Sequence, residues 1–454
     1  MWLKLVTKDE EEFVMTASQA METLSNLGAA DKVTYISNSI FIFLCAVLVF
    51  SMQAGFAMLE TGMTRSKNTS NIWLKNLMDF CVGVAVYFLL GFGLQYGDDF
   101  HGLFGANGFL NPFNAEMGIW SSCVDLMINP YVYFFFQLAF CGATATIISG
   151  AVAERFKFNS YLIISACMTG IAYPIASHWI WGGGWLSSLG FVDFAGTLAV
   201  HGIGGIAALV CAAMVGPRIG KYNKDGSSNV IKGHNESLFG LGAIFLWFGW
   251  YGFNPGSELG FDDAAAYAAI TSTIAGGVGG LAGLFCSWIV DKKPSVDAAY
   301  NGMLAGLVAI CTTANTQAPW STAIIAIVAA CVVYFAAKLV DQKLHIDDAC
   351  GAGSLHFISG IFGVLAPGIF GATAGFKQFG IQLLGEVCVF AFVFAVIGLA
   401  CVILKHTIGV RVSDEDQLLG MDISEHNTYA YDYLEENYEE ATHEHQGVAQ
   451  GVTA

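Results

Sequence analysis

The sequence predicts an all-α polytopic membrane protein with eleven transmembrane helices, arranged as two five-helix inverted repeats plus a final helix. Three observations lead to this fold. The 454 residues are 55% hydrophobic and only 12% charged, which is too little charge to cover a soluble protein of this length. Apolar stretches of about 20 residues, enough to cross a hydrocarbon core, recur along the chain. Two polar motifs of identical spacing also lie in two of these stretches.

Eleven apolar runs have the pattern expected of spans. They fall at 37–60, 72–97, 130–153, 159–181, 192–216, 236–257, 263–290, 297–314, 318–340, 348–371 and 379–405. The residues before the first run lack a basic segment followed by an apolar one, so we expect no cleaved signal peptide. An odd number of spans places the two termini on opposite sides of the membrane.

The distribution of basic residues predicts the orientation. Loops after even-numbered spans carry only Lys377, and the long segment 98–129 has no Lys or Arg. Loops after odd-numbered spans carry Arg65, Lys67, Lys75, Arg155, Lys157, Arg218, Lys221, Lys224, Lys232, Lys292, Lys293, Lys338, Lys343, Lys405 and Arg411. Basic loops stay in the cytoplasm, so the N-terminus is expected outside and the C-terminus inside. Lys4, Lys8 and Lys32 disagree mildly with this orientation.

These two predictions divide the chain into regions. We expect an extracellular tail at 1–36, a first repeat at 37–216, a cytoplasmic loop at 217–235, a second repeat at 236–371, an eleventh helix at 379–405 and a cytoplasmic regulatory tail at 406–454. The net charge of −17 lies largely in the two tails. Residues from about 434 onward are acidic with few apolar anchors, which is typical of disorder. No basic patch supports nucleic-acid binding.

Two aspartate–histidine pairs share one spacing. Asp193 precedes His201 by eight residues, and Asp348 precedes His356 by eight residues. The first pair opens span five and the second opens span ten, as expected of repeats with five spans each. Because an odd number of spans inverts the second repeat, the histidines are expected to meet near the bilayer middle. Transporters of this kind place their pathway at the repeat interface.

Other interpretations of the histidines are a local bond to a backbone carbonyl and a metal site. Ionisable groups inside a membrane are costly, and these two are symmetric, which favours a pathway. No third ligand accompanies them, and none of the twelve cysteines has zinc-ligand spacing, so we expect no metal and no cofactor. A second echo of the repeat joins Gly55-Phe56 in span one with Gly252-Phe253 in span six.

Several segments carry a family resemblance that extends from about residue 36 to residue 433. They are FSMQAGFAMLETG (50–62), FQLAF (136–140), SGAVAER (149–155), YPIASHWIWGGGW (173–185), DFAGTLAVHGIGG (193–205), WFGWYGFNPGS (247–257) and RVSDEDQLLGMD (411–422). In these segments the chain resembles the Amt branch of the ammonium transporter (Amt/Mep/Rh) family, and its plant-type members in particular. The resemblance implies a homotrimer with one pore in each subunit, in the plasma membrane.

The resemblance also implies roles for individual residues. Trp181, Phe136 and Ser257 would form an outer vestibule for the cation, with Asp193 supporting it without touching the substrate. Phe140 and Phe253 would close the pore beneath, and His201 and His356 would be the twin pore histidines. Taken alone, Trp181 is more typical of an interfacial belt residue, and the two phenylalanines are more typical of core or lipid contacts.

The chemistry of these residue types suits NH4+, with methylammonium as an analogue. Aromatic faces attract a cation, a hydrophobic constriction excludes hydrated ions, and neutral imidazoles can exchange hydrogen bonds or protons with NH3. The sequence leaves open whether NH3, NH4+ or NH3 plus a separate proton moves. A sensor without transport remains an alternative; a gas, water or urea channel and an enzyme fit less well.

The C-terminal tail of similar proteins docks on the neighbouring subunit and couples the pores. Gly420 matches a tight turn there, and Ser424 aligns with a phosphorylatable position. We expect phosphorylation of Ser424 to close the pore, and a cytoplasmic regulatory protein as a further partner. Phe357 departs from the family pattern, which has Gly after the second pore histidine.

Overall fold

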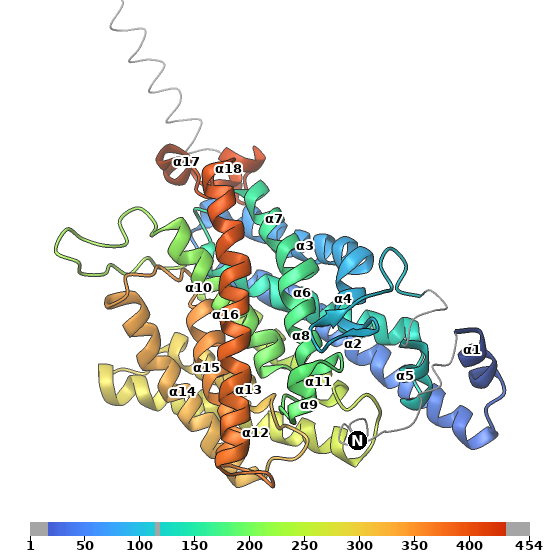
Figure 1. Cartoon of the computed structure of the whole chain (residues 1–454). Coiled ribbons are helices and arrows are strands. Elements are labelled where there is room, and N and C mark those ends of the chain that lie inside the picture. Colours follow the sequence, from blue (N-terminus) through green and yellow to red (C-terminus); the bar gives the residue numbers. More distant parts are fainter. Residues whose placement is uncertain (1–16, 114–118, 433–454) are drawn as a thin grey trace, which may run out of the picture.

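The computed structural model describes residues 17–113 and 119–432, and these are almost entirely helical (Figure 1). The predicted disorder from residue 434 onward lies outside the described residues. One two-stranded antiparallel hairpin, β1 (Asp99–Phe100) and β2 (Phe104–Gly105), interrupts the helices in the loop after the second span. Apart from this short hairpin, all regular elements of the described residues are helices, as the predicted all-α class requires.

The first half of the described chain contains fourteen helices, most of which belong to five segments that are long and apolar enough to cross a membrane. The helices are α1 (Ala17–Ser25), α2 (Ala29–Met63), η2 (Ser66–Asn68), α3 (Thr69–Val86), η3 (Tyr87–Gly91), α4 (Phe92–Tyr96), α5 (Ile119–Asp125), α6 (Pro130–Val152), α7 (Phe158–Cys167), η4 (Met168–Ala172), α8 (Tyr173–Trp181), α9 (Trp185–Leu189), η5 (Thr197–Gly202) and α10 (Ile203–Val215). The π-helical turns η3 and η4 each join two helices into one continuous segment, and η5 begins the segment that continues as α10.

Helices of the second half are longer and mostly uninterrupted. They are α11 (Glu236–Gly256), α12 (Asp263–Asp291), α13 (Val296–Ile310), α14 (Pro319–Gln342), α15 (Ala352–Ile369) and α16 (Phe376–His406). The short helices α17 (Asp414–Leu419) and α18 (Met421–His426) follow and cap one end of the bundle, here called the tail face (Figure 1).

Nine helical segments of the described residues are long and apolar enough to cross a membrane. This makes the chain a multi-pass membrane protein. The sixth and eighth predicted spans coincide with α11 and α13, which pack in the same bundle but are not among the nine. Gly, Trp, Tyr and Asn interrupt the apolar character of α11, and α13 has only 15 residues. The count of eleven and the repeat layout therefore remain predictions.

Two boundaries differ from the sequence prediction. Helix α2 begins at Ala29, well before the predicted start at residue 37. Its first turns are largely polar and exposed, and a hydropathy pattern detects only the apolar part of a helix. The helix of the fifth span begins at Thr197 rather than near 192. Lys75, counted above as a loop residue, is buried within α3, where its Nζ donates to the carbonyl of Phe156 over 3.3 Å.

Glycines bring α2 and α11 into close contact at the centre of the bundle. A Cβ on Gly242 would lie 2.3 Å from the amide nitrogen of Leu59, and one on Gly252 would lie 2.6 Å from the carbonyl oxygen of Cys45. Only residues without a side chain permit such an approach, and small residues at helix contacts are typical of membrane bundles. At this contact, glycines are therefore required for the close packing of the two helices.

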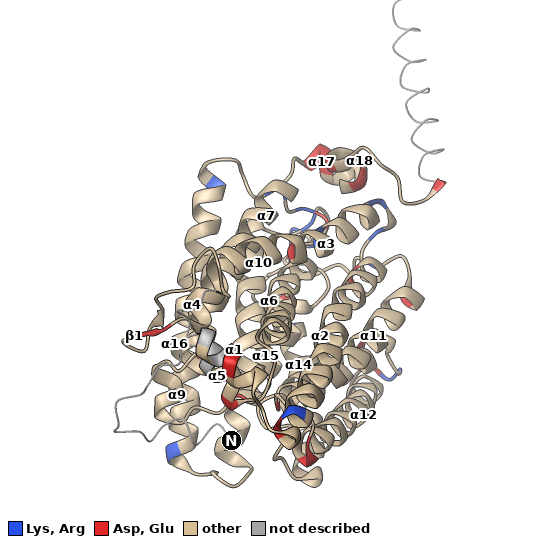
Figure 2. Ribbon diagram, turned by 90° about the vertical axis from the view of Figure 1, so that its right-hand side faces the viewer, with Lys and Arg blue, Asp and Glu red and all other residues tan. Residues whose placement is uncertain are grey.

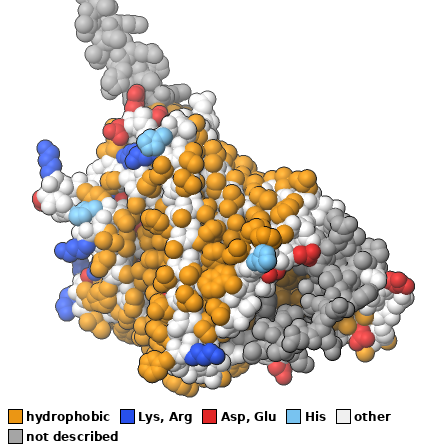
Figure 3. Space-filling view, in the orientation of Figure 1, with side chains coloured by type: hydrophobic (Ala, Val, Ile, Leu, Met, Phe, Trp, Pro, Cys, Tyr) orange, Lys and Arg blue, Asp and Glu red, His pale blue; other side chains and the backbone are white. Residues whose placement is uncertain are grey.

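The outer surface separates apolar and charged regions. A broad belt of hydrophobic side chains covers the face around α16 (Figure 3), with Leu399 at 62% and Phe394 at 59% exposure. Such exposure suits contact with lipid or with another subunit. Several basic residues instead lie in the segments beside α17 and α18 (Figure 2). Among them, Lys67 donates to the carbonyls of Gln417 and Leu418.

Candidate functional site

Two histidines lie face to face in the middle of the bundle. The ring centroids of His201 and His356 are 5.1 Å apart with 12° between their planes, and both residues are buried. His201 comes from η5 and His356 from α15. The backbones meet closely because Gly205 has no side chain: a Cβ there would lie 2.3 Å from the amide nitrogen of Phe357.

The nitrogen atoms of these rings are largely unpaired. Within the described residues, neither Nδ1 nor Nε2 of His201 has a hydrogen-bond partner, and Nδ1 of His356 has none. Buried polar side-chain atoms are normally paired. The alternative, in which His201 donates a hydrogen bond to a nearby backbone carbonyl, is not supported, because the described residues contain no such bond. An unpaired imidazole in a buried row is instead free to bond a small polar molecule.

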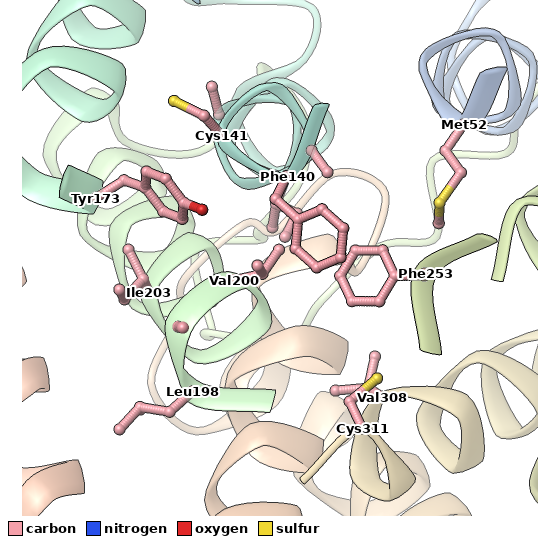
Figure 4. Close-up of a cluster of buried hydrophobic side chains, with 14 of the residues drawn as sticks. Met52, Phe140, Cys141, Tyr173, Leu198, Val200, Ile203, Phe253, Val308 and Cys311 are labelled. Carbon is pink, nitrogen blue, oxygen red and sulfur yellow. The ribbon is translucent and has the colours of Figure 1, made fainter. Parts of the chain in front are cut away.

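A row of aromatic rings continues from the histidines. The Phe253 ring lies 5.2 Å from His201, and Phe140 stacks on Phe253 at 4.1 Å and 19° (Figure 4). Trp250, which sequence reasoning missed, also stacks on His201 at 5.2 Å and 21°. Its spacing of three residues before Phe253 was the available signal, since i and i+3 share a helix face.

A small cavity lies on the far side of Phe140 from the histidines. The rings of Phe136 and Trp181 are 4.7 Å and 6.1 Å from that of Phe140. The cavity has a volume of about 20 Å³ and is lined by Tyr96, Phe136, Gln137, Phe140, Trp181, Phe194, Ser257 and Leu259. That volume holds about one water-sized particle. Ammonium is such a particle.

Four of the lining residues were not predicted. Gln137 carried a usable signal, because a polar side chain inside a span is uncommon and it is three residues before Phe140. Tyr96, Phe194 and Leu259 carried none, since their types occur throughout the chain. Ser257 lies at the end of α11, where its hydroxyl donates to the carbonyl of Phe253 over 2.8 Å and leaves its lone pairs as acceptors.

Asp193 acts through the backbone. Its carboxylate accepts four N–H groups at 2.7 to 3.0 Å, those of Gly196, Thr197, Leu198 and Ala199. Its carbonyl accepts the Nε1–H of Trp181 over 2.7 Å. The carboxylate therefore fixes the start of the helical segment that carries His201, while the carbonyl orients the tryptophan.

Asp348 repeats this arrangement. Its carboxylate accepts the N–H of Ser354 over 2.6 Å and that of Gly353 over 3.3 Å, at the start of α15. The spacing of eight residues thus has a structural cause: an aspartate just before each helical segment accepts N–H groups at the start of that segment, and the histidine follows about two turns after the aspartate. Phe357 directs its ring against Phe390 of α16, at 4.9 Å.

The tail face contains a cluster of buried ion pairs. Arg218 Nε lies 2.9 Å from an Asp347 carboxylate oxygen and its Nη1 lies 3.6 Å from Glu154, which also pairs with Arg65 at 2.5 Å. Burial alone favours the neutral acids, but the bonds and charge of Arg218 outweigh it and hold the pKa of Asp347 well below its usual range. Arg218 and Arg65 likewise lower the pKa of Glu154.

The two predicted tail residues lie against the same face. Gly420 has φ 117°, and a Cβ there would lie 2.7 Å from the carbonyl oxygen of Lys67, so both conformation and space require glycine. The hydroxyl of Ser424 is buried without a partner among the described residues, two positions after Asp422, whose carboxylate accepts the N–H of Asn71 over 2.8 Å. Burial raises the pKa of Asp422.

Comparison with known proteins identifies relatives along most of the chain. A sequence model described as the Ammonium Transporter Family matches residues 40–431. Ammonium transporter Amt2 of Archaeoglobus fulgidus is 39% identical and aligns over 86% of each chain. Ammonium transporter 1 member 1 of Arabidopsis thaliana is 36% identical, with 84% of this chain and 82% of the relative covered.

Solved structures have the same fold. One titled Sensor Amt Protein has a TM-score of 0.83 at 36% identity, covering 87% of this chain and 99% of that one. Mep2 of Candida albicans has a TM-score of 0.77 at 28% identity, covering 87% and 92%.

Proposed function

The chain belongs to the Ammonium Transporter Family, and on that premise we propose that it carries ammonium across a membrane through the row of rings around its twin histidines. One observation carries the proposal above the others. His201 is buried in the row without a hydrogen-bond partner among the described residues, next to a stacked phenylalanine pair and a cavity of ammonium size. The relatives are named as transporters, so a non-enzymatic function is consistent with them.

Recruitment is the first step. The faces of Trp181 and Phe136 attract NH4+ by about 2 kcal/mol when the site is desolvated, and Ser257 accepts one of its N–H groups. Asp193 orients Trp181 through its carbonyl, with its carboxylate held by backbone N–H groups. The cation is therefore held without a direct carboxylate contact, which favours its onward movement.

Passage through the rings is the second step. A bare ion in hydrocarbon costs tens of kcal/mol, and the stacked pair Phe140 and Phe253 leaves no room for a hydrated one. Ammonium can give up a proton and continue as NH3, which exchanges hydrogen bonds with His201 and His356. K+ has no proton to lose, and this gives the selectivity. The proton moves with NH3 or by a separate path.

Orientation and assembly extend the proposal. The basic tail face is assigned to the cytoplasm of a plasma-membrane protein, with the N-terminus outside. The belt around α16 and the apolar faces of α12 and α14 give surface for a homotrimer. The tail is proposed to regulate the pore. A Ser424→Asp variant is expected to reduce flux, with Ser413→Asp, in the exposed part of the tail, as its control; equal flux in both variants argues against this role.

The test is the ammonium-induced current across a membrane that holds only the purified protein, beside a His201→Ala/His356→Ala double variant. A saturable inward current that changes in the variant supports electrogenic transport through the histidines. An internal pH change without current means net conduction of NH3. Binding of ammonium with neither signal would overturn transport.

A sensor is the second candidate, because one matching structure carries that word in its title. The same experiment separates the two functions. A sensor binds ammonium without flux in the purified state, whereas a transporter moves it without any partner protein.

A further inference from the structure

Glu60 is a carboxyl group buried in the membrane-crossing helix α2, and only one of its oxygens is bonded. The side chain is 1% exposed. Oε2 accepts the amide N–H of Asn76 over 2.9 Å, and Asn76 in turn accepts the hydroxyl of Thr146 over 2.6 Å. Oε1 forms no hydrogen bond of complete geometry within the described residues; the Ser149 hydroxyl lies near enough to interact with the carboxyl group but also lacks a bond of complete geometry. One carboxyl oxygen is held in place by a hydrogen bond while the other can accept one, as expected of a group that binds a ligand.

The free oxygen faces the end of the ring row opposite to the cavity. A Cβ on Gly150 would lie 3.3 Å from Glu60 Oε1, 3.3 Å from Cys350 and 3.2 Å from Ala352. Ala352 begins α15, and His356 follows one turn later on that helix. The Phe56 ring, one turn before Glu60 on α2, lies 6.1 Å from the His356 ring. Glu60 therefore lies at the end of the row that Phe56 and His356 form, one turn beyond Phe56 on α2.

The internal repeat gives Glu60 a counterpart in the cavity. Phe56 and Phe253 occupy equivalent positions in the Gly-Phe echo, and each ring lies beside one of the two histidines. Four residues after Phe253 comes Ser257, which lines the cavity. Four residues after Phe56 comes Glu60.

The contacts between the two helices are reciprocal. A Cβ on Gly242 would lie 2.7 Å from the carbonyl oxygen of Gly55, and one on Gly252 would lie 2.6 Å from the carbonyl oxygen of Cys45, where Gly242 and Cys45 each precede the echo glycine of their own helix by ten residues. Gly55 and Gly252 are equivalent in the echo, and so each helix contacts the other in the same way. This supports equating the positions that follow them.

A purely structural role accounts for the bonded oxygen of Glu60 but not for the burial of Oε1. The hydrogen bond from Asn76 holds α2 against α3, but it uses Oε2 alone. No ion pair joins Glu60 to Lys75 among the described residues, since Lys75 Nζ donates to the carbonyl of Phe156. Glu386 of α16 is a second buried carboxyl group with an unpaired oxygen, and it belongs to neither helix of the Gly-Phe echo. It provides a matched control.

We infer that Glu60 forms a second binding site for ammonium, at the tail-face end of the pore, as the counterpart of the Ser257 position at the other end. Oε1 accepts an N–H of NH4+ there, and Oε2 stays anchored on Asn76. When ionised, a carboxyl group binds a cation more strongly than a hydroxyl does, and the positive charge of NH4+ beside Glu60 favours the ionised form. The inference rests on the proposed function, because it assumes that ammonium passes between the two ends.

The test measures entry of labelled methylammonium into membrane vesicles of both orientations. Right-side-out vesicles present the cavity of Trp181, and inside-out vesicles present the tail face. In the full-length protein, Glu60→Gln is expected to raise the apparent KM at least fivefold for entry from the tail face and less than twofold from the other side. Ser257→Ala is expected to show the reverse asymmetry, and Glu386→Gln to change neither value.

Each outcome is decisive. An equal KM shift from both sides, or none from the tail face, in Glu60→Gln would overturn the inference. If that variant yields no folded protein, Glu60→Asp keeps the charge but withdraws it from the site, and an unchanged tail-face KM in it would equally overturn the inference. Absence of methylammonium entry in the unchanged protein, from either side, would instead overturn the proposed function.

Discussion

The centre of the proposed pore and the tail face both bury polar groups, but they differ in whether these groups are hydrogen-bonded. At the tail face, Arg218 is shared between Asp347 and Glu154, and Arg65 completes the cluster. At the centre, His201 has no bonded partner among the described residues although it is equally buried.

This contrast separates structure from function. A buried charge is tolerated when its bonds are complete, and then it fixes the loops that carry it. A buried imidazole without hydrogen bonds costs free energy instead of stabilising the fold, and this is why we propose a functional use for its nitrogen atoms. The same distinction singles out Glu60, which is bonded at one oxygen and free at the other.

Arg218→Ala is expected to give the largest effect. It leaves the Asp347 and Glu154 carboxylates buried with one partner fewer, and breaking a buried pair costs about 3–5 kcal/mol. The apparent melting temperature of the purified protein in detergent should fall steeply. A variant that melts with the unchanged protein would show that the cluster is not structural.

The pH dependence of stability should also show the contribution of this ion-pair cluster. Because Arg218 lowers the folded pKa of Asp347, this carboxyl contributes stability above its ordinary pKa of 3.8 and loses it as the pH falls through the lower folded value. Asp347→Asn is expected to be less stable at pH 7, and its difference from the unchanged protein should shrink only below about pH 4. The check is the melting temperature across pH 3 to 7; a constant difference over this range contradicts the assignment.

His201→Leu should affect function and not stability. No hydrogen bond is lost, and a substitution of similar volume costs less than about 1.5 kcal/mol. Methylammonium flux is expected to fall at least about tenfold, equivalent to about 1.4 kcal/mol in the barrier. Flux and melting are measured on one preparation, and a loss of stability without loss of flux would reverse the contrast.

Lys338→Ala should give the smallest effect. Lys338 pairs with Asp291 at 2.8 Å, but both side chains are substantially exposed. Solvent screens such pairs, and holding two long side chains in place offsets the attraction. The melting temperature of the purified protein should not change measurably. A clear drop would show that exposed ion pairs stabilise the fold as the buried pairs do.

Much of the fold and part of the site could be predicted from the sequence. Hydropathy located most of the spans because membrane length and apolarity are local properties. The spacing of Asp193 and His201 was visible because a cap and its helix are adjacent in sequence. Trp250 and Gln137 were missed although each lies three residues before a predicted pore residue, because only the packed structure shows which other helices that face contacts.

The sequence by itself determined the membrane class, the positions of most helices and the paired aspartate–histidine motifs. These depend on composition and on residues less than three turns apart. Only the tertiary structure decided that Phe140 stacks on Phe253, that His201 lacks a partner and that one oxygen of Glu60 is free. Each of these depends on helix crossings fixed by backbone contacts at glycines such as Gly205 and Gly242, and such contacts join residues far apart in the chain.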